Sequence, residues 1–140
     1  MNRSQWQQLA ERYLVDAKTL LDNHRWSAAY YVAGYAVESG LKACVLVRLA
    51  ATPEVIFKIK RFSESCWTHN LAELMGLADL EPARAADAAA NPAFSDNWMI
   101  AQDWNEMSRY QTTTHHLAKK LYNAIVNTSN GVMPWIRVRW

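Results

Sequence analysis

The chain has 140 residues, of which 51% are apolar or aromatic and 20% are charged. This length and composition fit one domain with a buried core and exclude an intrinsically disordered chain. A net charge of +2 is too close to neutral to indicate nucleic-acid binding by itself, and four scattered glycines exclude a glycine-rich phosphate loop or a dinucleotide-binding fingerprint.

The cysteines and the apolar stretches bear on where the protein works. Cys44 and Cys66 are the only cysteines, and the N-terminal residues lead straight into an amphipathic pattern. These features favour a cytoplasmic protein with reduced thiols. The most apolar stretch, residues 28–51, contains charged residues, and its uncharged part is well short of the ~20 residues that span a bilayer. We therefore expect a buried core helix there and no membrane association.

The first half of the chain contains two long helical patterns. Apolar residues recur every three or four positions over residues 4–22, which predicts a helix with Ser4 as its N-cap. A second helix is predicted over residues 27–50, with Ser27 as its cap and Pro53 just after its end.

Glu38 and Lys42 are charged residues within the otherwise apolar second helix. Their spacing of four suits an ion pair along one helix face. Because a buried charge must be paired, Glu38 is expected to pair with Lys42 or with Arg109. In the second case Glu38 would orient the arginine.

Residues 52–66 form the least regular segment of the chain. Lys58, Lys60 and Arg61 lie there beside Phe57 and Phe62. Basic residues interleaved with aromatic ones can bind an RNA backbone and stack on its bases. The same pattern is typical of a solvated loop, so both interpretations stay open.

The second half of the chain is predicted to contain shorter helices. They are expected at 69–77, from Pro82 to Pro92, at 96–108 with Ser95 or Asp96 as cap, and from Thr112 or Thr113 to 127. Gly131 and Pro134 are predicted to end regular structure. The expected fold is an all-α antiparallel bundle of about five helices over residues 1–130. A basic aromatic tail, residues 131–140, is expected to pack on or near it.

The residues that could bind a metal or attack a substrate form no known motif. The four histidines make no Glu-x-x-His or His-Glu-x-x-His pattern, and the two cysteines lack zinc spacing. His69 and Glu73 are four apart, but a capping or loop role for His69 is favoured. Cys44 is expected to be a buried structural thiol. We expect neither a metal nor a cofactor.

The last predicted helix offers a candidate site at its start. A helical wheel groups Leu117 with Leu121 and other apolar residues on the core face, and His116 on a solvated face. His115 falls on a second, partly apolar face that would pack on another helix or another subunit. Arg109 comes just before this helix, and the amide donors of a helix start suit an anion such as phosphate.

Four segments in order resemble a known family. They are the apolar pattern of the first helix, the stretch AVESGLKA at 36–43, the stretch THNL at 68–71, and Arg109-Tyr110 before the last helix. Together these segments, which span most of residues 5–127, are similar to the HEPN domain. Each motif is short, and it is their order and spacing that carry the resemblance.

The resemblance implies a helical bundle that dimerises, and it points to ribonuclease activity. Many HEPN domains are metal-independent ribonucleases in which an Arg-x(4–6)-His motif from both protomers faces one cleft. Arg109 and His115, with five residues between them, fit that spacing. Arg109 would then hold the phosphate, and His115 would serve as general base or acid on the ribose 2′-hydroxyl or the leaving oxygen.

The residue after the arginine departs from this pattern. Ribonuclease members often carry a polar residue there, and this chain has Tyr110, as in members whose arginine is structural or binds a ligand. In that interpretation Arg109 anchors the helix end by pairing with Glu106 or Asp103, and His115 is an interface histidine.

Two functions from different classes therefore remain open, besides a plain interaction protein. The first is a metal-independent endoribonuclease of the toxin or defence type, with a composite site at a homodimer cleft and a nucleotidyltransferase antitoxin as partner. The second is a non-catalytic module that binds a nucleotide or a partner such as a minimal nucleotidyltransferase. Tyr110, Lys58, Lys60 and Arg61 are the candidate contacts to nucleotide or RNA.

Overall fold

The computed structural model describes all 140 residues and contains helices but no strand. The predicted all-α fold is confirmed. The helices are more numerous than the expected five because several are short. They are α1 (Arg3–Asp22), α2 (Trp26–Ala51), α3 (Val55–Lys58), α4 (Phe62–Ser65), α5 (Leu71–Leu77), α6 (Glu81–Ala90), α7 (Pro92–Gln102), the 3-10 helix η1 (Glu106–Tyr110), α8 (His115–Val126) and α9 (Val132–Arg137).

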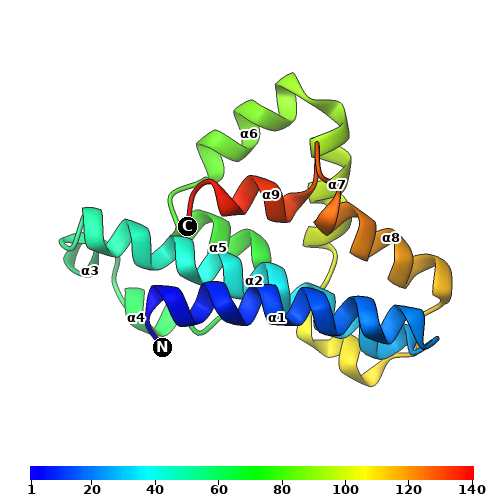
Figure 1. The fold of residues 1–140 in the computed structure, drawn as a ribbon. Helices are drawn as coiled ribbons and strands as arrows, with labels where there is room; N and C mark the ends of the chain where they lie inside the picture. The colour runs from blue at the N-terminus through cyan, green and yellow to red at the C-terminus, as the bar shows by residue number, and fades with distance from the viewer.

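Helices α1 and α2 form the long antiparallel pair on which the rest is built (Figure 1). Helix α1 is capped by Asn2, which exchanges two hydrogen bonds with Gln5 in a capping box, so Ser4 is not the cap. The buried residues of α1 include Ala10 and Ala17. Their small side chains let α2 approach closely.

Helix α2 is the centre of the fold, since α1, α5, α8, α9 and η1 all pack against it. It ends at Ala51 just ahead of Pro53, as predicted. Ser27, however, lies inside the helix and does not cap it. The Ser27 hydroxyl instead accepts the backbone N–H of Thr113 at 2.8 Å, which ties the start of α2 to the segment before α8.

Several predicted helix ends in the second half are wrong. Pro92 opens α7 rather than closing the preceding helix, because proline fits the first turn and Asn91 caps that turn through the N–H of Phe94. Helix α8 begins at His115 with Thr114 as its cap, later than expected. Leu117 is 49% exposed, and Ala118 is buried in its place.

The C-terminal residues add a helix that the sequence did not suggest. Pro134 sits in the first turn of α9, where proline is tolerated, so it does not end regular structure. The apolar face of α9 is fully buried, through Val132, Met133 and Ile136. Arg137 binds both carboxylate oxygens of Glu11 in α1 at 2.6 and 2.8 Å.

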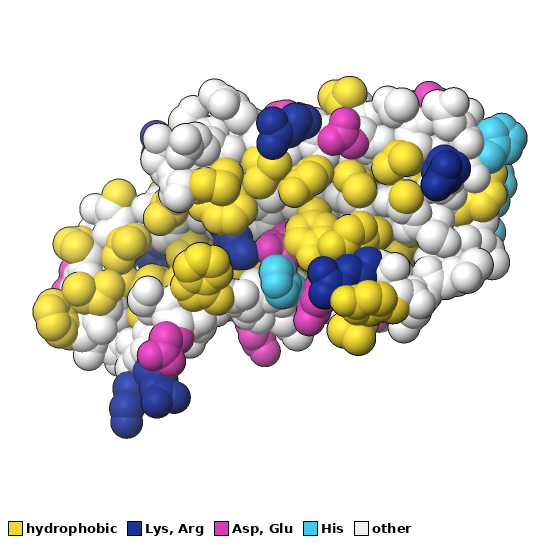
Figure 2. Space-filling model, turned by 90° about the horizontal axis from the view of Figure 1, so that it is seen from below, with side chains coloured by type: hydrophobic (Ala, Val, Ile, Leu, Met, Phe, Trp, Pro, Cys, Tyr) yellow, Lys and Arg dark blue, Asp and Glu magenta, His cyan; other side chains and the backbone are white.

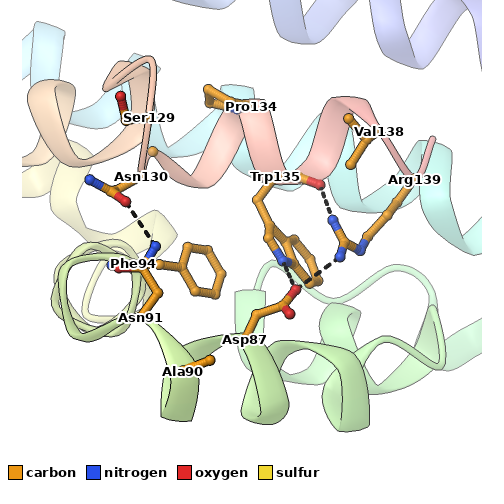
Figure 3. A pocket seen from close by; sticks show the side chains of 11 residues that line it. Asp87, Ala90, Asn91, Phe94, Ser129, Asn130, Pro134, Trp135, Val138 and Arg139 are labelled. Carbon is orange, nitrogen blue, oxygen red and sulfur yellow. Dashed lines mark hydrogen bonds and ion pairs between the residues drawn. The ribbon is translucent and has the colours of Figure 1, made fainter.

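Helix α6 lies above this body and has no buried residue. Asp87 joins it to α9, because its carboxylate accepts from Trp135 Nε1 at 2.7 Å and from Arg139 Nη2 at 3.0 Å (Figure 3). Phe94 stacks on Trp135 at a ring separation of 5.4 Å. These side chains line a cavity of about 310 Å³ between α6, α7 and α9. None of the helices is both long and apolar enough to cross a membrane.

Candidate functional site

Arg109 lies on η1 and has no carboxylate partner among the ion pairs of the structure. The predicted pairings with Glu106, Asp103 or Glu38 are therefore wrong. Its guanidinium lies 4.7 Å from the centre of the exposed Tyr110 ring. The neighbouring Tyr31 hydroxyl is the main cause that raises the pKa of Arg109. The arginine is thus positioned by aromatic side chains and left available for an anion.

A cleft of about 580 Å³ opens beside Arg109, between the start of α2 and the segment before α8. Tyr31 and Thr112 contribute hydroxyl groups to its wall, and Arg25 contributes a second guanidinium. Two guanidinium groups beside a hydroxyl donor such as Thr112 suit a phosphate group.

His115 occupies a neighbouring hollow of about 280 Å³. It is the first residue of α8, its side chain is exposed, and its ring lies against Trp26 with ring centres 4.3 Å apart. Lys119 and Tyr122 line the same hollow. The imidazole makes no ion pair with a carboxylate.

Trp26 lies between the two candidate residues, because its side chain lines both the cleft of Arg109 and the hollow of His115. The ring of His24 also contacts the indole, at 5.0 Å between centres. Arg109 and His115 therefore lie at the same end of the molecule but line different depressions within one chain.

A buried charge cluster lies further along α2, and the sequence predicted only part of it. The Glu38 side chain is 4% exposed, and its Oε1 lies 2.7 Å from Lys42 Nζ, as the spacing predicted. Its Oε2 lies 2.9 Å from Nδ1 of His69, the residue just before the cap of α5. Glu73 accepts instead from the Thr68 hydroxyl.

The sequence contained one signal for the contact between Glu38 and His69, namely a carboxylate in an apolar helix. A buried carboxylate needs a polar partner for each oxygen. No three His, Cys, Asp or Glu side chains are grouped as metal ligands would be.

A pair of tyrosines connects this cluster to the cleft. The Tyr31 hydroxyl, in the cleft wall, donates to the Tyr35 hydroxyl at 3.2 Å. The Tyr35 ring meets the ring of His69 edge-on at 6.0 Å. Burial is the main cause that raises the pKa of Tyr35, so its phenol keeps its proton at neutral pH.

The basic residues near α3 and α4 are far from Arg109. They follow the far end of α2, and 26 residues of helix span about 39 Å. Lys58 pairs with Glu54 and Arg61 with Glu64, whereas Lys60 has no ion pair. The structure thus separates these residues from the cleft.

The comparisons with known proteins give one match. A family model for the HEPN domain matches residues 4–139, nearly the whole chain and including α9. No curated protein and no solved structure matches the chain. HEPN domains are nucleotide-binding or ribonuclease-type modules, and the all-helical fold agrees with this class. The order of motifs along the chain and this match together show that the protein belongs to the HEPN domain family.

Proposed function

We propose that this protein is a metal-independent endoribonuclease whose active site combines residues of two copies of the chain. The observation that carries the proposal is the pair of side chains without carboxylate partners at one end of the molecule. Arg109 has no carboxylate partner, and His115 is exposed. Trp26 lies between their depressions, so a second protomer would bring the histidine to the arginine of the first. HEPN domains commonly dimerise.

The chemistry needs one charge-neutralising group and proton transfer. Arg109 would bind the phosphate and stabilise the charge that develops on its oxygens. His115 would take the proton of the ribose 2′-hydroxyl or give one to the leaving oxygen. Tyr110 is the proposed contact to RNA beside the phosphate, and Lys58, Lys60 and Arg61 would contact RNA that extends to the far end of α2.

The proposed cellular role is that of a toxin or defence ribonuclease in the cytoplasm, held inactive by a nucleotidyltransferase antitoxin. A second candidate function is a non-catalytic module that binds a nucleotide. The contact between Trp26 and His115 favours it, because the indole stands between the histidine and the cleft. The two arginines that line the cleft would still bind a phosphate group.

Cleavage of single-stranded RNA in EDTA tests the proposal. We would compare the wild type with Arg109→Ala, His115→Ala and the matched control His116→Ala, an exposed histidine next in sequence. General acid–base catalysis contributes ~10²–10⁴-fold and electrostatic stabilisation by one donor ~10²–10³-fold, so the first two variants should each lose at least ~100-fold and the control should not. Products should end in a cyclic phosphate, and mixing Arg109→Ala with His115→Ala should restore cleavage if the site is shared.

One result would contradict the ribonuclease, and a second would contradict the assigned role of His115. The first is a folded, dimeric wild type that leaves RNA intact, and the second is a His115→Ala variant as active as the wild type. Nucleotide binding that is lost in Arg109→Ala, without any cleavage, would support the binding module.

A further inference from the structure

We propose that His69, oriented by the buried carboxylate of Glu38, is a second proton-transfer residue that acts on RNA together with Arg109 of the same chain. The inference rests on the proposed ribonuclease function, because its substrate is the ribose 2′-hydroxyl beside a phosphate. It differs from that function in naming a histidine outside the Arg-x(4–6)-His motif.

The hydrogen bond of His69 fixes which ring nitrogen is free. Glu38 Oε2 lies 2.9 Å from Nδ1, and a carboxylate can only accept, so Nδ1 carries the proton. In the neutral ring Nε2 then has a free lone pair. No hydrogen bond engages Nε2, and the side chain is 42% exposed. This is the arrangement of a general base whose tautomer is set by a buried acid.

Glu38 is itself held in place on both oxygens. Lys42 Nζ lies 2.7 Å from Oε1 and also sits over the Trp6 ring at 5.1 Å. A carboxylate that is 4% exposed and bound on both sides has little freedom to turn. His115, by contrast, has no carboxylate to select its tautomer, and its ring lies against Trp26.

The tyrosines place His69 on the same side of α2 as the cleft of Arg109. Tyr31, Tyr35, Glu38 and Lys42 follow one another at spacings of four, three and four, which puts them on one face of the helix. Tyr31 lines the cleft of Arg109 at one end of this stripe, and Glu38 holds His69 about 10 Å further along.

The surroundings of this stripe suit single-stranded RNA. Trp67, two residues before His69, is 79% exposed, and such a ring can stack on a base. On the face shown in Figure 2, hydrophobic side chains form a band along the molecule, with a histidine and charged side chains set in its middle. Stacked bases would lie on this band while the phosphates reach the charged groups.

The proposed step is balanced without a metal or a redox partner. His69 Nε2 takes the proton of the 2′-hydroxyl, and the 2′-oxygen bonds to phosphorus while the bond from phosphorus to the 5′-oxygen breaks. The 5′-oxygen takes a proton from water, and His69 returns its proton to solvent. Arg109 neutralises the phosphate oxygens. The products are a 2′,3′-cyclic phosphate and a 5′-hydroxyl end.

The test is the pH profile of kcat/KM for a short single-stranded RNA in EDTA. The variants are His69→Asn, Glu38→Gln, His115→Ala and the control His116→Asn. We expect His69→Asn to lose ~10²–10⁴-fold in kcat/KM and His116→Asn to match the wild type. Glu38→Gln should lose less and shift the rising limb of the profile, which a merely structural role would leave in place.

Three groups face His69. They are the carboxylate of Glu38, the ammonium of Lys42 that pairs with this carboxylate, and the phenol of Tyr35. The Glu38→Gln substitution removes the charge of Glu38, which is also the ion-pair partner of Lys42, and leaves the Tyr35 phenol as it is.

A second measurement needs no variant. Diethyl pyrocarbonate modifies free imidazole nitrogens, and peptide mass mapping locates the modified residues. Loss of wild-type activity should follow modification of His69.

Full activity in His69→Asn, with activity lost in His115→Ala, would overturn this inference and leave the ribonuclease standing. A folded wild type that cleaves no RNA would overturn both.

Discussion

Replacing Gly34 by alanine tests how η1 is held against α2. A Cβ at this position would lie 2.0 Å from Cε2 of the Trp104 ring, whereas carbon atoms normally approach to about 3.5–4.0 Å. The ring is 2% exposed and its Nε1 has no hydrogen-bond partner, so packing alone fixes it. One of the two groups must therefore move by about 1.5 Å.

Helix propensity and core packing change the free energy of unfolding of Gly34→Ala in opposite directions. Alanine gains up to ~1 kcal/mol over glycine inside a helix, and overpacking a well-filled core costs ~1–3 kcal/mol. With a contact this short we place the cost at the top of that range, so Gly34→Ala should lose about 2 kcal/mol of unfolding free energy. Because Trp104 lies two residues before η1, the same change should displace Arg109 and weaken the proposed phosphate binding.

Urea denaturation followed by circular dichroism measures this effect, and Gly76→Ala is the matched control. A Cβ at Gly76 in α5 would meet nothing within 4 Å, so that variant should be unchanged or more stable by up to ~1 kcal/mol. If Gly34→Ala is as stable as Gly76→Ala, the contact with Trp104 does not limit the packing of α2 and the reasoning fails.

Three further predictions concern the buried groups. Glu38→Ala leaves Lys42 buried without its partner, and urea denaturation should show a loss of ~3–5 kcal/mol; a loss below about 1 kcal/mol would mean that water solvates the lysine. Burial raises the pKa of the Cys44 thiol to about 12, so Cys44 should resist alkylation at pH 8 in the native protein.

The Cys44 thiol loses its proton at a lower pH in the unfolded chain than in the folded protein. The free energy of unfolding should therefore fall above about pH 8.5 by up to ~1.4 kcal/mol per pH unit. This decrease should be smaller in Cys44→Ala. Trp135→Phe removes the donor to Asp87 and should cost ~1 kcal/mol, whereas an unchanged urea midpoint would show that this bond contributes nothing.

The parts of the fold that follow from local pattern could be predicted from the sequence. The two long helices, the end of α2 before Pro53 and the position of α5 depend on periodicity and on one proline, and the structure has them within a few residues. The wheel of the last helix was right for Leu121 but wrong for Leu117. The width of a buried face depends on how closely the neighbouring helix approaches, and no local pattern contains that distance.

The parts that failed depend on partners far away in sequence. Ser27 has the right residue type for a cap, but its hydroxyl binds Thr113, 86 positions away. Residues 131–140 were expected to pack on or near the bundle as an irregular tail, but they form α9 on a surface that α2, α7 and α8 provide.

The candidate site divides in the same way. Arg109 and His115 could be selected by their spacing, but Trp26 between their depressions and the link from Glu38 to His69 could not. Both depend on contacts between α2 and residues more than 30 positions later in the chain, because His69 is 31 positions after Glu38 and His115 lies further still from Trp26.

The lack of buried residues in helix α6 affects how this chain can change over evolutionary time. None of its ten residues is buried, and Asp87 supplies its hydrogen bonds to α9. Its amide hydrogens can therefore exchange through a local opening that leaves the core closed, whereas those of α2 need the whole domain to unfold. Substitutions along α6 that keep its helix propensity cost the domain little, so this segment is free to diverge while the stripe on α2 stays constrained.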